Sequence, residues 1–389
     1  MATTVLIAAG AYTPDEMDGP VAITLRDEYI ESVGHDIETA TRSAESVLDL
    51  GELRVAPGYV DLHTHGFAGR DVTTGTEEDL AAMAEALPAT GVTAFFPTIA
   101  STGRGETRRQ VERVGAAMQR TASRSAELLG VRLEGPFINR AKKGAQAEAA
   151  IRPPDPDELA ELARLGPIRF VDFAPEQDAG FVLLGSLVQR GIVGAIGHSA
   201  ATYEQALAAL DAGARHCTHL FNAMPPLEHR APGAAGALLT DGRATLEVIA
   251  DGIHVHPAFL RLALRLRGAA AVALVTDAIS AVGLSDGSYT FVGREVSVRG
   301  GAVRLDDGTL AGSVLTMDQA VRNMVNLVGL SWSEAIRMAT LTPATIAGVS
   351  QRKGQIVPGA EADLVVLDGT GEVRETWRAG ERVYVSRSS

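Results

Sequence analysis

The sequence has few of the features that mark secreted or membrane-spanning proteins. Its 389 residues include a single cysteine, Cys217, so no intramolecular disulfide can form. This agrees with the reducing cytosol, and we expect a cytoplasmic protein. The opening residues, MATTVLIAAG, lack the positive charge that begins a secretory signal peptide. No uninterrupted apolar run is long enough to span a bilayer.

An excess of positive charge is also missing. The formal net charge is −13, which argues against a general binder of nucleic acid or anionic membranes, because both need a basic face. We therefore expect neither nucleic acid nor membrane as a partner. An anionic small-molecule substrate stays allowed, since a site can be basic locally.

The composition that is present, 46% hydrophobic and 21% charged, suits a globular protein with a large core. From about residue 56, apolar strand-like runs alternate with amphipathic helical stretches, which predicts parallel strands joined by right-handed crossovers. The first strand ends at Leu62, and the others are expected at 92–99, 128–133, 168–173, 192–197, 216–221, 246–250 and 271–276. Helices are expected between them at 77–87, 106–118, 156–164, 181–190, 203–212 and 257–266. Eight such units favour a (β/α)₈ barrel.

The two ends of the chain have a different pattern. Short strands are expected at 4–8, 21–25, 30–33 and 47–50, separated by turns. After the eighth barrel strand, 288–305 indicates a hairpin or meander, 317–327 and 332–339 indicate helices, and 356–385 returns to strands. We predict an α/β fold: a TIM-like (β/α)₈ barrel over 56–355. A small β-sandwich domain would be formed by residues 1–55 and 356–389.

Two histidines close the first barrel strand. The apolar run from Leu53 to Leu62 indicates one buried strand, and His63 and His65 follow it. Side chains alternate along a strand, so both rings share a face. Two neutral imidazoles placed in this way can hold a metal ion. The competing interpretation is a pair of histidines satisfied by hydrogen bonds, because short motifs often match by chance.

Further polar residues fall at the ends of later strands, where the active sites of such barrels lie. They are Glu134 after the third strand, His198 after the fifth, His219 on the sixth, Asp251 and His254 after the seventh, and Asp277 after the eighth. Each one alone has an ordinary structural explanation, such as a helix N-cap or a satisfied core histidine. Together they predict a hydrolytic metal site, because histidine and carboxylate are its usual ligands.

The remaining histidines and the cysteine have weaker claims. Period-two alternation puts Cys217 on the same face as His219, and His216 on the opposite face. Cys217 could therefore line the barrel interior, although the role of a small buried apolar residue is favoured. The other weak candidates are His35 in the small domain, His229, and His256 at an expected helix start.

Several segments match a known family in its order along the chain. They are PGYVDLHTHG (57–66), LEGPF (133–137) with KKGA (142–145), GHSAAT (197–202), THLFNAM (218–224) with HRAPG (229–233), DGIH (251–254), VTDA (275–278) and LAGS (310–313). On these segments the chain resembles the amidohydrolase superfamily and, within it, the N-acetylglucosamine-6-phosphate deacetylases. The segments cover most of the chain and together are specific to that group.

The resemblance implies a metal held by Glu134, His198 and His219. His63 and His65 match positions that hold a second metal in some members, so one or two divalent ions per subunit are expected. Zinc is favoured, and iron, cobalt and manganese also suit these ligands. A homodimer is expected from the resemblance alone.

The resemblance also implies how the substrate is held. Asp277 matches the catalytic acid–base, and His254 would donate a hydrogen bond to the acetyl oxygen. Arg230 matches an arginine that reaches across a dimer interface to the sugar phosphate. The other substrate contacts match Ala145, Asn222, Ala223, Asp251, Leu310, Ala311 and Gly312.

Two departures limit the comparison. Gln146 stands where many members carry a histidine, and the loop after it is rich in alanine. No lysine at a strand end is placed to bridge two metals, which argues against the dihydroorotase-like and hydantoinase-like branch of the superfamily.

The expected reaction is hydrolysis of N-acetyl-D-glucosamine 6-phosphate to D-glucosamine 6-phosphate and acetate, in amino-sugar catabolism or cell-wall recycling. A metal-activated water would be the nucleophile, and Asp277 would move its proton to the leaving amine. Two alternatives stay open: a deacetylase of another N-acyl substrate, such as an N-acyl-D-amino acid, and a non-catalytic metal-binding barrel. The presence of both Asp277 and His254 argues against the second.

Overall fold

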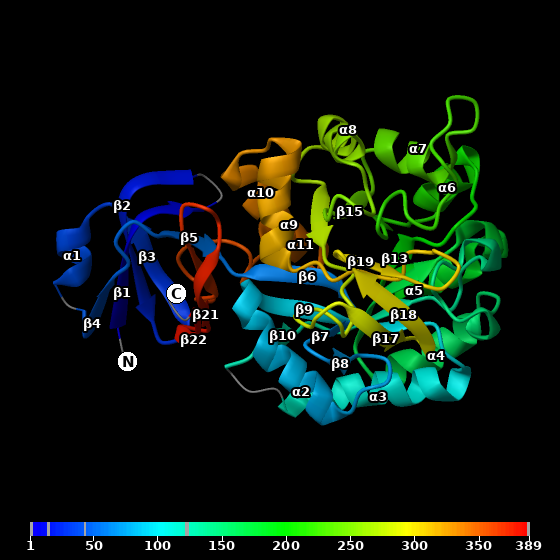
Figure 1. The fold of residues 1–389 in the computed structure, drawn as a ribbon, viewed down its shortest axis with the longest axis horizontal. Helices are drawn as coiled ribbons and strands as arrows, with labels where there is room; N and C mark the ends of the chain where they lie inside the picture. The colour runs from blue at the N-terminus through cyan, green and yellow to red at the C-terminus, as the bar shows by residue number, and fades with distance from the viewer. Residues whose placement is uncertain (1–2, 14–15, 43, 121–123, 387–389) are drawn as a thin grey trace.

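A parallel barrel and a smaller sheet built from both ends of the chain make up the fold (Figure 1). The computed structural model describes residues 3–13, 16–42, 44–120 and 124–386. Figure 1 shows the smaller sheet, in blue and red, beside the barrel, whose elements run from the blue β6 through cyan, green and yellow to the orange α10.

Within the described residues, eight parallel strands form the barrel. In sheet order they are β6 (Tyr59–Thr64), β9 (Val92–Ala100), β11 (Val131–Glu134), β12 (Ile168–Phe173), β13 (Val193–Ile196), β14 (His216–Cys217), β15 (Thr245–Ile249) and β16 (Val272–Val275). A bridge between Thr64 and Ala278 connects the first strand to the end of the last. All residues of β6, β9 and β16 are buried, as expected for strands covered on both faces. The predicted (β/α)₈ barrel is confirmed.

Helices follow the strands and cover the outside of the barrel. They are α2 (Glu77–Ala86), α3 (Arg104–Arg120), α4 (Pro156–Leu165), α5 (Val182–Gln189), α6 (Tyr203–Asp211), α7 (Gly233–Thr240), α8 (Pro257–Arg267), α9 (Met317–Asn323), α10 (Trp332–Ala339) and α11 (Leu341–Ile346). Capping boxes begin α2 at Thr76 and α6 at Thr202. Every predicted helix is present, but α7 was missed because it is buried from Gly233 to Leu239 and so shows no amphipathic period. In the described part of the chain, no helix has the length and apolarity to cross a membrane.

The smaller sheet pairs strands from the two ends of the chain. Its order is β22 (Glu381–Val385), β21 (Val373–Arg378), β20 (Leu364–Leu367), β5 (Arg54–Pro57), β1 (Thr3–Tyr12), β2 (Glu16–Arg26) and β3 (Tyr29–Gly34), with β4 (Ser46–Asp49) on β1. It encloses its own apolar cluster, which includes Leu6, Ile23 and Val366. The division of the chain at residues 55 and 356 stays a prediction, and its extremes, 1–2 and 387–389, lie outside the described residues.

The run from Leu53 to Leu62 is two strands in different sheets, so the prediction of one strand is wrong. β5 pairs with β20 of the smaller sheet, whereas β6 pairs with β9 of the barrel. Between them the N–H of Gly58 donates to the carbonyl of Asp363 at 2.8 Å. A Cβ at Gly58 would lie 2.2 Å from the Thr93 hydroxyl, so the crossing needs glycine. An apolar pattern carries no signal for such a crossing.

Strand β14 ends earlier than predicted, at Cys217 instead of residue 221. His219 and Phe221 then adopt φ of +25° and +77°, which ends regular strand geometry. The alternation argument is therefore wrong: His216 faces the barrel interior, where its Nε2 lies 2.7 Å from Oε1 of Glu247. Cys217 is a buried free thiol.

Two short sheets border the carboxyl end of the barrel. The predicted meander consists of β17 (Gly287–Phe291), β18 (Arg294–Arg299) and β19 (Ala302–Arg304), which are antiparallel. The ring of Phe291 lies 5.2 Å from that of His65, so the meander covers one side of the histidine pair. The hairpin β7 (Gly66–Phe67) and β8 (Arg70–Asp71) was not predicted.

An ion cluster ties the barrel to the smaller sheet. Glu127, on the short strand β10 (Glu127–Leu128), lies 2.6, 2.9 and 3.0 Å from Arg352, Lys353 and Arg378. The same three cations also contact acids of the loop before β20. Burial raises the pKa of Glu127, but the hydrogen bond from Arg352 and the charge of Lys353 outweigh it and lower the pKa to about 2.

We expect Glu127→Gln to reduce the free energy of unfolding at pH 7 by about 1–3 kcal/mol, because it leaves buried cations under-compensated. The folded pKa lies below the ordinary 4.5, so the contribution is complete above pH 4.5 and is lost as pH falls toward 2. Denaturant unfolding of both proteins at pH 7 and pH 3 measures this. The control Glu381→Gln removes an exposed partner of Arg124 and should cost under about 0.5 kcal/mol. Equal losses at both pH values would contradict the assignment.

Candidate active site

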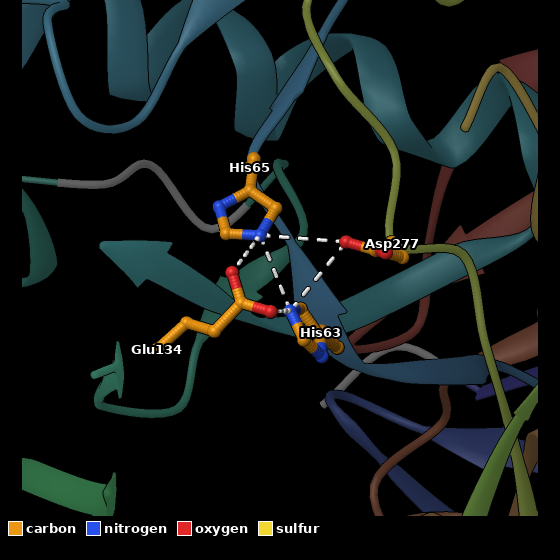
Figure 2. A group of neighbouring side chains, drawn as sticks. All are labelled: His63, His65, Glu134 and Asp277. Carbon is orange, nitrogen blue, oxygen red and sulfur yellow. Dashed lines mark hydrogen bonds and ion pairs between the residues drawn. The ribbon is translucent and has the colours of Figure 1, made fainter. Parts of the chain in front are cut away.

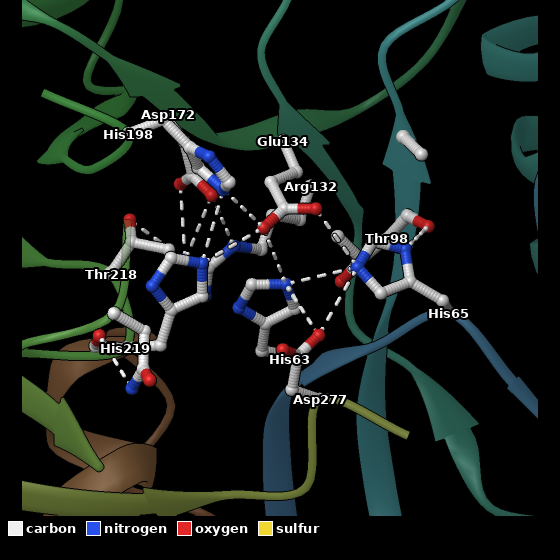
Figure 3. A network of polar contacts seen from close by, with 12 residues as sticks. His63, His65, Thr98, Arg132, Glu134, Asp172, His198, Thr218, His219 and Asp277 are labelled. Carbon is white, nitrogen blue, oxygen red and sulfur yellow. Dashed lines mark hydrogen bonds and ion pairs between the residues drawn. The ribbon is translucent and has the colours of Figure 1, made fainter. Parts of the chain in front are cut away.

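Histidine and carboxylate side chains from five strands converge at the carboxyl end of the barrel. They are His63 on β6 and His65 just after it, Glu134 on β11, His198 after β13, His219 after β14 and Asp277 after β16. All are buried. Figure 3 shows the six side chains pointing toward one another across the barrel mouth.

The first group consists of His63, His65, Glu134 and Asp277 (Figure 2). The Nε2 atoms of His63 and His65 lie 3.2 Å apart. Oε2 of Glu134 is 3.0 Å from Nε2 of His65. Oδ1 of Asp277 is 3.5 and 3.4 Å from the same two imidazole nitrogens. One cation placed among these four atoms would therefore have two nitrogen and two oxygen ligands.

The second group shares Glu134 and adds His198 and His219. Oε1 of Glu134 lies 2.9 Å from Nε2 of His198 and 3.0 Å from Nε2 of His219. The two nitrogens are 3.2 Å apart. Oε1 also lies 3.5 Å from Nε2 of His63. Glu134 thus belongs to both groups and could be a ligand in each.

The donor set fits a divalent cation. Neighbouring ligands about 2.0–2.2 Å from a tetrahedral zinc ion lie roughly 3.3 Å apart, which is close to the observed separations. The Nδ1 atoms of His65 and His198 lie 3.0 and 2.8 Å from the carbonyls of Thr98 and Lys142. A carbonyl can only accept, so each Nδ1 carries the proton and each Nε2 has a lone pair for a metal.

The buried carboxylates of the cluster also need a neighbouring positive charge. Burial lowers the pKa of His65, but Glu134 and Asp277 outweigh it and raise the pKa to about 10. Burial opposes a raised pKa at His219 too, and Glu134 brings it to about 9. Burial disfavours the ionised Glu134, yet His65 and His63 hold its pKa well below the usual range. These acids therefore need a cation beside them, which is either a proton on a ring or a metal ion.

The backbone is left-handed at three of the converging residues. The φ angles are +46° at His198, +25° at His219 and +48° at Asp277. Such angles are uncommon outside glycine and gather at functional sites. The N–H of Asp277 donates to the carbonyl of His63 at 2.9 Å, and its carbonyl accepts from Ser313 at 2.8 Å. Barrel closure thus holds the Asp277 carboxylate over the histidines.

A cavity of ≈ 410 Å³ opens from the cluster toward solvent, within the size range of small-molecule sites. Of the residues that the sequence assigned to substrate, Ala145, Asn222, Ala223, His254, Leu310 and Gly312 line it. Ala311 is fully buried beside it. Asp251 does not line the cavity but contacts His254, with its Oδ2 2.6 Å from Nδ1 of the imidazole.

Comparison with known proteins agrees with this geometry. A family model described as the amidohydrolase family matches residues 54–383.

The chain belongs to the amidohydrolase family.

Its curated relatives include N-acetylgalactosamine-6-phosphate deacetylase of Escherichia coli O157:H7, 40% identical over 84% of this chain and 87% of that protein. N-acetylglucosamine-6-phosphate deacetylase of Bacillus subtilis (strain 168) is 35% identical over 96% of this chain and 92% of that protein. A solved structure of N-acetyl-D-glucosamine-6-phosphate deacetylase from Mycobacterium smegmatis, a mutant in complex with N-acetyl-D-glucosamine-6-phosphate, has a TM-score of 0.92 at 35% identity. It covers 98% of this chain and 100% of that one.

Some residues with weaker or different claims lie outside the cavity of this amidohydrolase. Arg230 is exposed and does not line it. His35 is exposed with Nδ1 2.9 Å from the carbonyl of Pro20, and His229 is also exposed. His256 accepts from the N–H of Ala258 at the start of α8, as a helix-start residue should.

The structure also adds residues that sequence reasoning missed. Gln146 is buried, donates to Oε2 of Glu134, and accepts from the N–H of Ser101 at 2.7 Å. Arg304 lines the cavity from the end of β19. The sequence did contain a signal for Gln146, because this residue stands where many members of the family carry a histidine. Arg304 had none, because it follows the last barrel strand in the chain and reaches the cavity only through the meander.

We expect Glu134→Gln to lower the metal content of the purified protein more than any other single change, because Glu134 belongs to both groups. The loss of affinity should exceed the roughly 10–100-fold typical of losing an outer hydrogen-bond partner. His65→Asn should weaken only the first group. Elemental analysis after dialysis measures both. The control is Asp178→Asn, which removes a buried carboxylate that accepts from the N–H groups of Leu183 and Leu184 in α5. Unchanged metal content in Glu134→Gln would refute the metal centre.

Proposed function

We propose that the protein hydrolyses N-acetyl-D-glucosamine 6-phosphate to D-glucosamine 6-phosphate and acetate. The observation that carries this is the paired histidine–carboxylate cluster at the base of a ≈ 410 Å³ cavity. Support comes from the relative named N-acetylglucosamine-6-phosphate deacetylase, which matches 96% of the chain. The reaction would serve amino-sugar catabolism or cell-wall recycling in the cytoplasm.

The cation would be held by Glu134, His198 and His219, and a second by His63 and His65 with the shared carboxylate. Zinc suits this nitrogen and oxygen set, as do iron, cobalt and manganese. When bound, a divalent cation acidifies a water molecule and polarises the acetyl carbonyl.

Asp277 is the proton carrier in this proposal. Burial opposes ionisation of its carboxyl, but the charge of His63 and the hydrogen bond with His65 lower its pKa. The carboxyl is therefore ionised and has lone pairs available for a proton from water. Its carboxylate lines the cavity, which allows the same group to protonate the leaving amine. A single positioned carboxylate can serve both half-steps.

His254 would bind the acetyl oxygen as negative charge develops there. Its Nδ1 donates to Asp251, so Nε2 is the nitrogen available to the cavity. Donation from Nε2 while Nδ1 donates to Asp251 requires a ring that carries a proton on both nitrogens. Loss of such a donor typically costs about 10²–10³ in rate.

Two arginines could provide the positive charge that binds the substrate phosphate. Arg230 is exposed and does not line the cavity of its own subunit. This position suits a side chain that enters the cavity of a second subunit in a homodimer. Arg304 lies in the cavity of its own subunit. A backbone N–H from Asn222 or Ala223 could also bind the phosphate. The N–H of Asn222 already donates to the carbonyl of His219 at 3.0 Å, so the N–H of Ala223 is the one proposed for the phosphate.

The deciding experiment is acetate release from N-acetylglucosamine 6-phosphate, its unphosphorylated form and N-acetylgalactosamine 6-phosphate, on protein of known metal content. We expect a large kcat/KM advantage for the phosphate esters, abolished by chelation. The third substrate is included because the 40% identical relative is named for it, and a preference for it would change the proposed sugar. Asp277→Asn should lower kcat by about 10²–10⁴. No turnover of any of the three would refute the proposed function.

The two arginine variants assign the phosphate site. We expect Arg230→Gln to raise KM for the phosphorylated substrate at least about tenfold, because an arginine fork suits phosphate geometry. Turnover of the unphosphorylated sugar should stay unchanged. Arg304→Gln, tested in parallel, should have the smaller effect. Sedimentation of each variant establishes its oligomeric state. A larger effect from Arg304→Gln would place the phosphate within one subunit.

A further inference from the structure

A network of buried charged and polar side chains fills the barrel interior directly beneath the ligand cluster. It consists of Arg132, Asp172, His216 and Glu247, each 0% exposed. Nη2 of Arg132 lies 3.0 Å from Oδ1 of Asp172, and Nη1 contacts Oε1 of Glu247. Figure 3 shows Arg132 and Asp172 next to the ligand side chains. Burying such groups costs desolvation energy, and apolar replacements are often as stable. Packing alone therefore does not explain the network.

Arg132 donates to both oxygens of Glu247, with Nη2 3.2 Å from Oε2, and the other partners of the two oxygens differ. Oε1 accepts from Arg132 and lies 2.7 Å from Nε2 of His216. Oε2 lies 3.4 Å from Nδ1 of His63 and accepts from the backbone N–H of His219 at 3.3 Å. Glu247 thus connects the network to two members of the ligand cluster, one on β6 and one just after β14.

Each of these two contacts has a consequence for metal binding. An ionised carboxylate only accepts, so it places the His63 proton on Nδ1 and leaves the Nε2 lone pair facing His65 and Asp277. The contact with the His219 N–H supports a residue whose φ is +25°, which needs its surroundings to hold it.

We propose that Glu247 is a positioning residue that sets the tautomer of His63 and holds the backbone of His219 for cation binding, with Arg132 and His216 keeping its carboxylate in place. The proposal rests on the proposed function only in that the cluster binds a cation. It does not depend on which sugar is hydrolysed.

Glutamine at position 247 is the sharpest substitution. The amide oxygen would take the place of Oε1, because Nη1 of Arg132 donates there and Nε2 of His216 lies 2.7 Å away. The amide nitrogen would then replace Oε2 and meet two other donors, the N–H of His219 and Nη2 of Arg132. It would also donate toward Nδ1 of His63 and favour the tautomer with the proton on Nε2, where the cation must bind.

Asp172 provides the matched control. It is buried to the same degree and pairs with the same arginine. Its hydrogen bonds in the described structure go to Arg132, and none reaches a ligand of the cluster. Asp172→Asn therefore disturbs the charge network without removing a hydrogen bond to His63 or His219.

The experiment compares Co²⁺ and Zn²⁺ affinity, by chelator competition, and the Co²⁺ absorption spectrum in wild type, Glu247→Gln and Asp172→Asn. Unfolding by denaturant is measured alongside. We expect Glu247→Gln to weaken cation affinity about 10–100-fold and to change the spectrum. Asp172→Asn should lose stability yet keep the wild-type affinity and spectrum. Affinity within about twofold of wild type in Glu247→Gln, or equal weakening in both variants, would overturn the proposal.

Glu247→Asp is the second variant, and it replaces Glu247→Gln in the cation-affinity measurement if the glutamine variant does not fold. Its charge still faces Arg132, but the carboxylate is one methylene further from His63, so weaker Co²⁺ binding is expected and unchanged binding would overturn the proposal. None of these measurements depends on substrate turnover. Wild-type protein that binds Co²⁺ as expected but hydrolyses none of the sugar phosphates would refute the proposed function and leave the role of Glu247 standing.

Discussion

The carboxylate of Glu134 lies between two sets of imidazoles, and the arrangement of the barrel mouth depends on that position. Its Oε1 faces His198 and His219, while its Oε2 faces His65. Burial by itself favours a neutral carboxyl, yet the surrounding positive charge keeps the pKa of Glu134 well below its usual range. A buried anion persists only with cations beside it. The fold therefore has to bring imidazoles from separate strands to one point, and that point is where a divalent cation would bind.

Closure of the barrel meets this requirement. The last strand returns to the first, and the hydrogen bonds that join them run from His65 to Ala278 and from Asp277 to His63. The backbone interactions that complete the ring are thus the same ones that set Asp277 over the histidines. The smaller sheet contributes to the same alignment, because Gly58 passes the chain from β5 into β6 while its N–H donates to Asp363, the residue directly before β20. Stability and site geometry consequently share their hydrogen bonds.

Much of the ligand set was predictable because parallel strands of a barrel bring their carboxyl ends to one rim. A histidine or acid that follows an apolar run is therefore placed near others of its kind without knowledge of the packing. Gln146 and Arg304 could not be placed in this way, since they lie on segments whose path over the cavity depends on contacts with the rim. The charges at Arg132 and Glu247 were visible inside apolar strands, but their pairing depends on which strands face each other across the barrel.

By itself the sequence determined the barrel, through the alternation of strand and helix patterns, and the kind of chemistry, through residue type at the strand ends. The tertiary structure alone decided which oxygen of Glu134 faces which imidazole, and that His216 instead of Cys217 points to Glu247. The reason is geometric. Periodicity specifies the direction of a side chain only within a regular strand. Where φ becomes positive, as at His219, direction depends on contacts between segments far apart in the chain.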